Sequence, residues 1–227
     1  RDKATSNICT AQALLAIISA AYAIYHGPHR LLNIANNIHY HTRYLKKSLE
    51  FIGFKVTSKK FFDTILVKNE QAKYWVEKSI KEGINFRYVN DGHFSISLDE
   101  TTTLQDVDKI IELFNEKNIN IYEDEIENNI ENSFFEVDLK RENEILTHPV
   151  FNIYHSETEM MRYLKKLENK DIALNRSMIP LGSCTMKLNS ASEMLSITLP
   201  GFSNAHPFLE SHQRQGYNQM MKELISM

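Results

Sequence analysis

The sequence "SMIPLGSCTMKLN" gathers small, chemically active side chains within a few positions. Gly182 precedes Ser183, Cys184 and Thr185, so a flexible backbone position stands next to two hydroxyls and a thiol. A proline earlier in the stretch favours a turn. We interpret the stretch as a loop that presents functional groups, and the rest of the chain must supply their partners.

Two kinds of covalent catalysis are chemically open to this loop. Cys184 could be a nucleophile if His148 or His155 lay beside it and took its proton. Nothing in the sequence brings these residues together, so a packed or hydrogen-bonding thiol is the favoured interpretation. Lys187 could hold a carbonyl cofactor as a Schiff base, but a lone lysine is usually a solvated cation.

Other common site motifs are absent from the sequence. It contains no glycine-rich phosphate loop of the G-x-G-x-x-G or G-x-x-x-x-G-K-[ST] type. The acidic run 123–136 lacks the regular carboxylate spacing and the glycine of a calcium loop. His39 and His41 stand two apart in an expected helix and therefore face different sides. No metal site is expected.

Composition places the chain among ordinary soluble proteins. Hydrophobic residues make up 42% and charged residues 24% of 227 residues. The net charge of -3 argues against a general nucleic-acid binder. Two cysteines are too few for a disulfide framework and favour a reducing compartment. The longest apolar run, "AQALLAIISAAYAIY", is shorter than the about 20 residues of a membrane span and predicts a buried helix.

The first part of the chain predicts two helices and then a small α/β layer. The first helix ends at "HGP", and the second carries leucine and isoleucine at helical spacing up to Gly53. Residues 54–116 then predict the order β-α-β-β-α. Within it, Asp91-Gly92 is a two-residue turn signal followed by alternating apolar residues, which indicates a hairpin.

The chain begins a new unit after an acidic connector. We expect the connector over residues 117–145 and a new unit from 146 onwards. Two capping boxes predict helix starts, Ser156-x-x-Glu159 and Ser190-x-x-Glu193. The last residues predict a further helix with methionine, tyrosine and leucine facing inward.

Three stretches of the sequence resemble one family closely. These are "RDKATSNICTAQALLA", "LTHPVFNIYHSETEMMRYLKKLENKDIALNRSMIPLGSCTMKLN" and "NAHPF". They resemble the decarboxylating glycine dehydrogenases, the P-proteins of the glycine cleavage system, and the resemblance runs through all 227 residues. Members of this family are several times longer than this chain, so the resemblance implies an internal piece.

The resemblance implies a fold and a division of the chain. The family is internally duplicated, and each half resembles a fold-type I pyridoxal-phosphate enzyme of the aspartate aminotransferase kind. Residues 1–53 would be helices leaving the large domain of the first half, and residues 54–116 its small α/β domain. Residues 117–145 would be the connector, and residues 146–227 the N-terminal segment of the second half.

The resemblance also implies a reaction. The family uses pyridoxal phosphate to release CO2 from glycine and passes the aminomethyl group to the lipoyl carrier protein. The whole protein would be a homodimer in the bacterial cytoplasm or the mitochondrial matrix, with no nucleic-acid or membrane partner. The cofactor lysine of the family lies in an "NLHK"-type motif, which this chain lacks, so Lys187 is not that lysine. We expect the cofactor lysine beyond Met227 and the chain alone to be inactive.

The same resemblance suggests where the opening loop lies. It would stand at the mouth of the second active site, where Gly182, Ser183, Cys184 and Thr185 could bind a carboxylate or orient the substrate. His155 would belong to the wall of the same site. The simpler alternatives are a rigid turn for the loop and a helix cap for "HSET". A different class of function, assembly or carrier docking without catalysis, also stays open, and a cysteine hydrolase ranks last.

Overall fold

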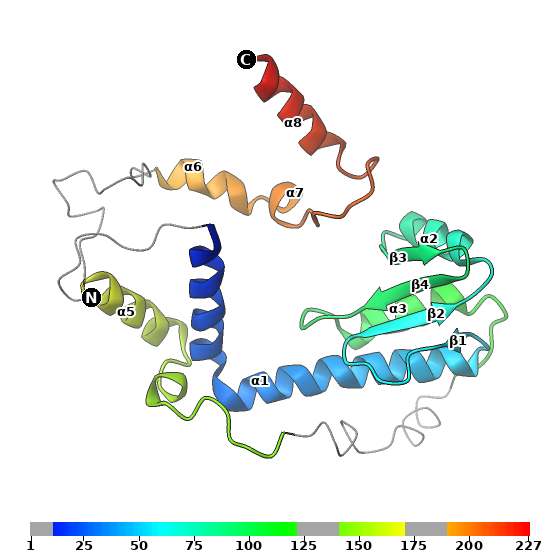
Figure 1. Ribbon diagram of the computed structural model, residues 1–227, viewed down its shortest axis with the longest axis horizontal. Coiled ribbons are helices and arrows are strands. Elements are labelled where there is room, and N and C mark those ends of the chain that lie inside the picture. The colour runs from blue at the N-terminus through cyan, green and yellow to red at the C-terminus, as the bar shows by residue number, and fades with distance from the viewer. Residues whose placement is uncertain (1–10, 122–140, 171–189) are drawn as a thin grey trace. The chain divides into compact units, whose positions relative to one another are not determined.

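The computed structural model describes residues 11–121, 141–170 and 190–227 (Figure 1). These residues fall into two compact units. Residues 15–161 form one, and residues 11–14 with 162–227 form the other, both with the gaps just named. The loop residues Gly182, Ser183, Cys184, Thr185 and Lys187 lie outside the described residues.

A long, interrupted helix opens the first unit. Helix α1 runs over Ala11–Phe51 and contains a break at Gly27, which has φ 65° and ψ 178°. Pro28 follows, and its fixed φ and missing N–H suit the first turn of a new helix. The sequence prediction of two helices separated at "HGP" is therefore confirmed, although the second helix continues directly from the break.

A four-stranded antiparallel sheet follows α1. Its strands are β1 (Lys55–Val56), β2 (Thr64–Lys68), β3 (Arg87–Asn90) and β4 (His93–Ser97), in the order β1-β2-β4-β3. Asn90 pairs with His93 across the Asp91-Gly92 turn, which confirms the predicted hairpin. The sequence missed β1 because two residues are too short to show an alternating pattern.

Two helices complete this layer. Helix α2 covers Ala72–Lys81 and α3 covers Leu104–Phe114, as the apolar spacing predicted. The buried strand residues Ile65, Val67, Phe94 and Ile96 all lie on one face of the sheet. Because their neighbours along each strand are half-buried or exposed, the helices pack against that one face only.

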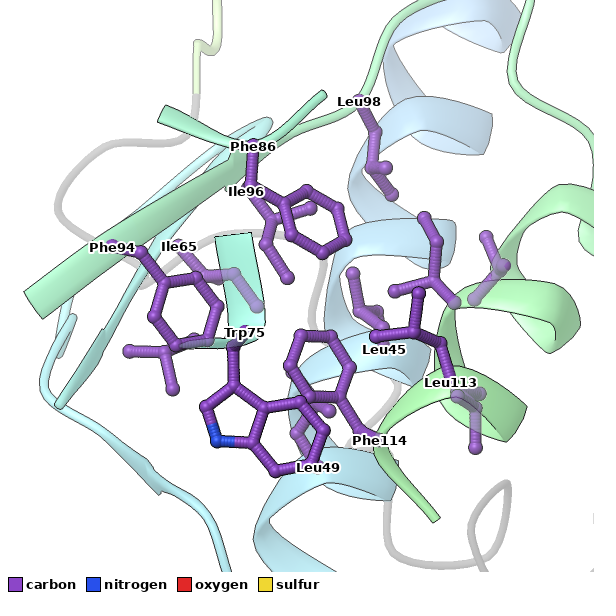
Figure 2. Close-up of a cluster of buried hydrophobic side chains, with 14 of the residues drawn as sticks. Leu45, Leu49, Ile65, Trp75, Phe86, Phe94, Ile96, Leu98, Leu113 and Phe114 are labelled. Atoms are coloured by element: carbon purple, nitrogen blue, oxygen red, sulfur yellow. The ribbon is translucent and has the colours of Figure 1, made fainter. Parts of the chain in front are cut away.

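Phe114 at the end of α3 is the centre of the core. Its ring lies 5.0 Å from the Trp75 ring, 5.6 Å from Phe94 and 5.6 Å from Phe86 (Figure 2). The rings of Phe86 and Phe94 stack on it nearly parallel, while Trp75 is tilted. Aromatic contacts of this kind add to the stabilisation from apolar burial. One ring therefore joins α2, α3 and the hairpin.

The second half of α1 belongs to the same core. Tyr44, Leu45, Leu49 and Ile52 are buried in the cluster that contains the sheet, and Figure 2 shows Leu45 and Leu49 beside Leu113 and Phe114. The helix and the sheet therefore share one set of buried side chains. A domain boundary between residues 53 and 54 stays a prediction.

The first half of α1 behaves differently. Leu15, Ile17 and Ile18 have exposed fractions of 66%, 61% and 53%. The expectation that this apolar helix is buried is wrong for the described structure, because none of the described elements covers these side chains. Within the described ranges, no helix combines the length and apolarity that crossing a membrane requires.

The rest of the described chain consists of short helices. Helix η2 (Pro149–Asn152) lies in the first unit, and α5 (Glu157–Glu168) begins there and ends in the second. The second unit also contains α6 (Ala191–Leu195), η3 (Ser196–Thr198), α7 (Pro200–Ser203) and α8 (Gln215–Ser226). Both predicted capping boxes form, since Glu159 accepts from the Ser156 N–H and Glu193 from the Ser190 N–H. The final helix is confirmed, but its Met221 and Leu224 are exposed rather than inward.

We predict that the start of α3 depends on Thr103. Its hydroxyl accepts from the Asp106 N–H, and its own N–H donates to the Asp106 carboxylate. Thr103→Ala should lower the free energy of unfolding by about 1 kcal/mol, measured by urea denaturation. Gln105→Ala, an exposed change in the same helix, should have almost no effect and serves as control.

The same capping box makes this end of α3 sensitive to acid. Hydrogen bonds from Thr103 hold the pKa of Asp106 below its ordinary value of 3.8. The stabilisation is therefore present above pH 3.8 and is lost as the pH falls through the lower pKa of the folded state. An equal urea midpoint for Thr103→Ala and the parent chain at neutral pH would contradict the assigned cap.

Candidate functional site

His155 is the member of the predicted site that the structure describes. It stands between η2 and α5, next to the break in α1, and is half-buried. The four loop residues predicted with it, Gly182 to Thr185, lie outside the described ranges. The described part of the predicted site is therefore His155 with the residues that surround it.

A hydrogen bond fixes the ring of His155. Its Nδ1 lies 2.8 Å from the Tyr25 carbonyl oxygen, in the last turn before the α1 break. A carbonyl can only accept, so Nδ1 carries the hydrogen. In the neutral imidazole this leaves Nε2 as the hydrogen-bond acceptor and proton acceptor of the ring. The arrangement is the one a histidine needs if it is to bind or take a proton at Nε2.

The absence of a side chain at Gly27 makes room for this ring. A Cβ at Gly27 would lie 2.6 Å from His155 Cε1 and 2.6 Å from the Phe151 carbonyl oxygen. Both distances are far below van der Waals contact. The backbone conformation of Gly27, with φ 65° and ψ 178°, is also one that side-chain-bearing residues almost never adopt. Two independent reasons therefore require glycine at position 27: its backbone conformation, and the close approach of His155 and Phe151.

Arg30 makes a second connection across this junction. Its Nη1 donates to the His155 carbonyl oxygen at 3.2 Å. His155 is therefore hydrogen-bonded to residues on both sides of the break. Tyr25, 130 residues earlier in the sequence, precedes the break, and Arg30, 125 residues earlier, follows it. We call Tyr25, Gly27, Arg30 and His155 the kink junction.

The residues after His155 have a separate, local role. Ser156 accepts from the Glu159 N–H and donates to the Glu159 carboxylate, so Ser156 caps α5. These hydrogen bonds lower the pKa of Glu159 from its ordinary value. The helix-cap interpretation of "HSET" is confirmed for Ser156, while His155 itself points to α1. Sequence reasoning had not separated the two roles.

A hollow of about 510 Å³ is lined in part by Pro28 and His29, which follow the break in α1. Leu32, Ile145 and Leu146 supply apolar lining, and Arg141 and Glu144 add opposite charges. Because these side chains are largely exposed, the hollow is an open groove rather than an enclosed pocket. Its size alone does not define a ligand.

Neither a metal centre nor an enclosed lysine is found in the described part of the chain. No cluster of three or more histidine, cysteine, aspartate or glutamate side chains in these ranges could hold a metal ion. Every described lysine is half-buried or exposed. The kink junction is therefore the one described arrangement that contains a residue predicted for the site.

The sequence analysis named His155 as a site residue, which stays a prediction, and it did not name Tyr25 or Arg30. The partner of His155 is a main-chain carbonyl, which every residue type carries, so no side-chain pattern could have identified it. For Gly27, the sequence predicted only the end of the first helix. Its neighbour Pro28 explains the new helix start, but nothing local indicates that a histidine more than 120 residues later packs on it.

We predict that a side chain at Gly27 breaks the junction. Gly27→Ala should lower the free energy of unfolding by more than the about 1–3 kcal/mol that backbone strain alone costs, because the methyl group also meets His155 and Phe151. Gly83→Ala is the matched control, since Gly83 has φ 77° and nothing within 4 Å of its added Cβ. Urea denaturation of both variants measures the difference.

A double-mutant cycle isolates the contact. His155→Ala should recover part of the loss caused by Gly27→Ala, because it removes one of the two clashing groups. His155→Asn keeps a short side-chain N–H near the position of Nδ1 and should be more stable than His155→Ala. Additive effects of Gly27→Ala and His155→Ala would show that the two residues are not in contact.

Comparison with known proteins gives a consistent result. The model of the family "Glycine cleavage system P-protein" matches residues 1–114. The glycine dehydrogenase (decarboxylating) of Christiangramia forsetii is 50% identical over 226 residues, and that of Vibrio parahaemolyticus is 49% identical over 226 residues. The mitochondrial glycine dehydrogenase (decarboxylating) of Pisum sativum is 45% identical over 225 residues.

The lengths of these proteins differ greatly. Each of the three matches covers 99% of this chain but only 23%, 24% and 21% of the relative, in the order given. The chain thus spans somewhat less than a quarter of the length of the curated relatives that it matches. With half of its residues matched by the family model and nearly all of them aligned to these relatives, the chain belongs to the glycine cleavage system P-protein family.

Proposed function

We propose that this chain is part of a glycine dehydrogenase (decarboxylating). The parent enzyme would release CO2 from glycine with the help of pyridoxal phosphate and pass the aminomethyl group to a lipoyl carrier protein. The observation that carries this proposal is 45–50% identity over 99% of the chain to relatives that bear this name. An alignment that covers nearly the whole chain at this level of identity supports the same reaction for the parent enzyme.

The proposed architecture is a duplicated fold-type I enzyme. A small antiparallel sheet with helices on one face, preceded by a long helix, fits the small domain of such a half. Residues 54–116 would be this domain, and residues 146–227 the start of the second half. In this interpretation the kink junction joins the two halves, because Tyr25 and Arg30 belong to the first and His155 to the second.

Pyridoxal phosphate does not fit the described residues as a bound group. When bound, it would supply the electron-withdrawing ring that stabilises the carbanion left by decarboxylation. A Schiff-base lysine needs a desolvated pocket, and every described lysine is half-buried or exposed. We therefore propose that the cofactor lysine belongs to the rest of the parent enzyme and not to this chain, and we derive no step through the cofactor.

The contribution of this chain would be to position and bind. The kink junction fixes His155 with Nε2 as its free acceptor, and residues 177–189 would lie near the substrate. Backbone N–H groups near Gly182 and the hydroxyls of Ser183 and Thr185 would bind the glycine carboxylate. Cys184 would be a packed or hydrogen-bonding thiol rather than the nucleophile of a hydrolase.

A second candidate function is assembly without catalysis. The first half of α1, where Leu15, Ile17 and Ile18 are exposed, favours it, because groups of neighbouring exposed apolar side chains often mark an interaction surface. The partner would be the other subunit of a homodimer or the lipoyl carrier protein. The compartment would be the bacterial cytoplasm or the mitochondrial matrix.

A chimera separates the two functions. We predict that the Christiangramia forsetii enzyme, with its corresponding 226 residues replaced by this chain, keeps measurable release of labelled CO2 from glycine. The isolated 227-residue chain mixed with pyridoxal phosphate should release none and should form no specific adduct on borohydride reduction. A well-folded chimera without activity would favour the assembly function, and an adduct mapped to Lys187 would overturn the cofactor assignment.

The same chimera tests the loop residue by residue. Ser183→Ala and Thr185→Ala should each lower turnover by up to about 10²-fold if the hydroxyls bind the substrate. Their effect on stability should stay near about 1 kcal/mol, since the side chains are small. Cys184→Ala should likewise lower turnover more than stability, if the thiol helps to orient the glycine carboxylate or the incoming lipoyl sulfur. Normal turnover with a clearly lowered melting temperature would make residues 177–189 a structural turn.

A further inference from the structure

The open face of the sheet carries an unusual row of basic side chains. In the register of the strands, Lys55 of β1 lies directly opposite Lys68 of β2, and Lys68 lies opposite His93 of β4. Residues that pair across antiparallel strands point to the same face. Because Val56, Val67 and Phe94 pair on the side that packs against the helices, the basic row faces away from the core.

A second row on the same face adds an arginine. Arg87 of β3 pairs with Ser95 of β4, and Ser95 pairs with Leu66 of β2. Lys55, Lys68 and Arg87 are exposed, and His93 is half-buried. The strand positions of this face carry no carboxylate. We call Lys55, Lys68, Arg87 and His93 the basic face.

The charges of the basic face have no compensation within the described part of the chain. No described residue forms an ion pair with Lys55, Lys68 or Arg87, whereas Lys73 and Lys78 both have glutamate partners. His93 Nδ1 lies 3.1 Å from the amide oxygen of Asn90, which can only accept, so Nδ1 is the donor of this hydrogen bond. Like charges directly opposite each other in a sheet are destabilising. The opposed pair Lys55 and Lys68 therefore does not stabilise the sheet.

We propose that the basic face is the docking surface for an acidic protein partner. Adjacent strands lie about 4.8 Å apart, so the four side chains are spread over roughly 14 Å of sheet. A small anion is usually held by groups that converge in a hollow, which a pleated sheet face does not form. An extended, carboxylate-bearing protein surface matches the spacing and the sign of charge, and complementary charge of this kind speeds association and fixes register.

Other polyanions fit the basic face less well. Single-stranded nucleic acid needs aromatic rings for base stacking, and the strand positions of this face carry none, because Tyr88 pairs with Phe94 on the opposite side. The chain as a whole has a net charge of -3, which opposes general phosphate-backbone binding. Leu66 is the one large apolar side chain among the paired strand positions of this face, and it is half-buried, so insertion into a lipid surface has little support.

The test uses the 227-residue chain with a fluorescein-labelled polyglutamate peptide as the acidic probe. Fluorescence anisotropy at low salt should show binding, and about 1 M salt, where the Debye length is about 3 Å, should abolish it. Lys55→Glu/Lys68→Glu should weaken binding at least about tenfold, because two of the three fully charged side chains of the face, a directly opposed pair on β1 and β2, change sign.

A matched variant controls for net charge. Lys73→Glu/Lys81→Glu changes the charge by the same amount on exposed positions of α2 and should bind the probe like the parent chain. The single variant Lys68→Glu separates binding from folding. It places opposite charges across β1 and β2, so its melting temperature should stay equal or rise while its affinity for the probe falls.

Three outcomes would overturn the proposal. The parent chain could fail to bind polyglutamate at low salt. The α2 control could lose as much affinity as the β1–β2 variant. Single-stranded DNA or phosphatidylserine vesicles could bind more tightly than polyglutamate through the same two lysines, which would make the face a phosphate surface. None of these results depends on glycine decarboxylation, so failure here and failure of the proposed function are distinguishable.

Discussion

The backbone conformation of Gly27 is the constraint on which the arrangement around α1 depends. With φ 65° and ψ 178°, this residue interrupts the helix without a loop, and Pro28 restarts it at once. A residue with a side chain would resist the conformation and would collide with His155 and Phe151. One glycine thus sets the direction of the second half of α1 and leaves the space that the histidine ring fills.

The two halves of α1 meet different surroundings because of this break. The second half places Leu45 and Leu49 against the sheet, where the Phe114 ring holds α2, α3 and the hairpin together. The first half is as apolar in sequence but is exposed at Leu15 and Ile17. Burial is therefore decided by the neighbours that a helix meets and not by its composition alone. A chain that spans less than a quarter of its relatives leaves such neighbours unaccounted for.

Local sequence patterns predicted the local structure well. The Asp91-Gly92 turn, α2, α3 and both serine capping boxes follow from residues within a few positions of one another. The patterns failed for features that depend on distant contacts. Strand β1 exists because Val56 pairs with Val67, and the exposure of Leu224 reflects the lack of a described neighbour. The order β1-β2-β4-β3 also needs pairing between distant strands, which no single stretch encodes.

The candidate site shows the same limit in its chemistry. Resemblance to a family pointed to His155, and the capping box beside it was visible from Ser156 and Glu159 alone. What holds the histidine is a carbonyl at Tyr25, and a carbonyl has no sequence signature. That bond decides which ring nitrogen is protonated, and hence which nitrogen can accept a proton. The tautomer of His155 is thus set by the Tyr25 carbonyl, which lies 130 positions away and which no sequence pattern reveals. The glycine at the break in α1 leaves the space in which the two groups meet.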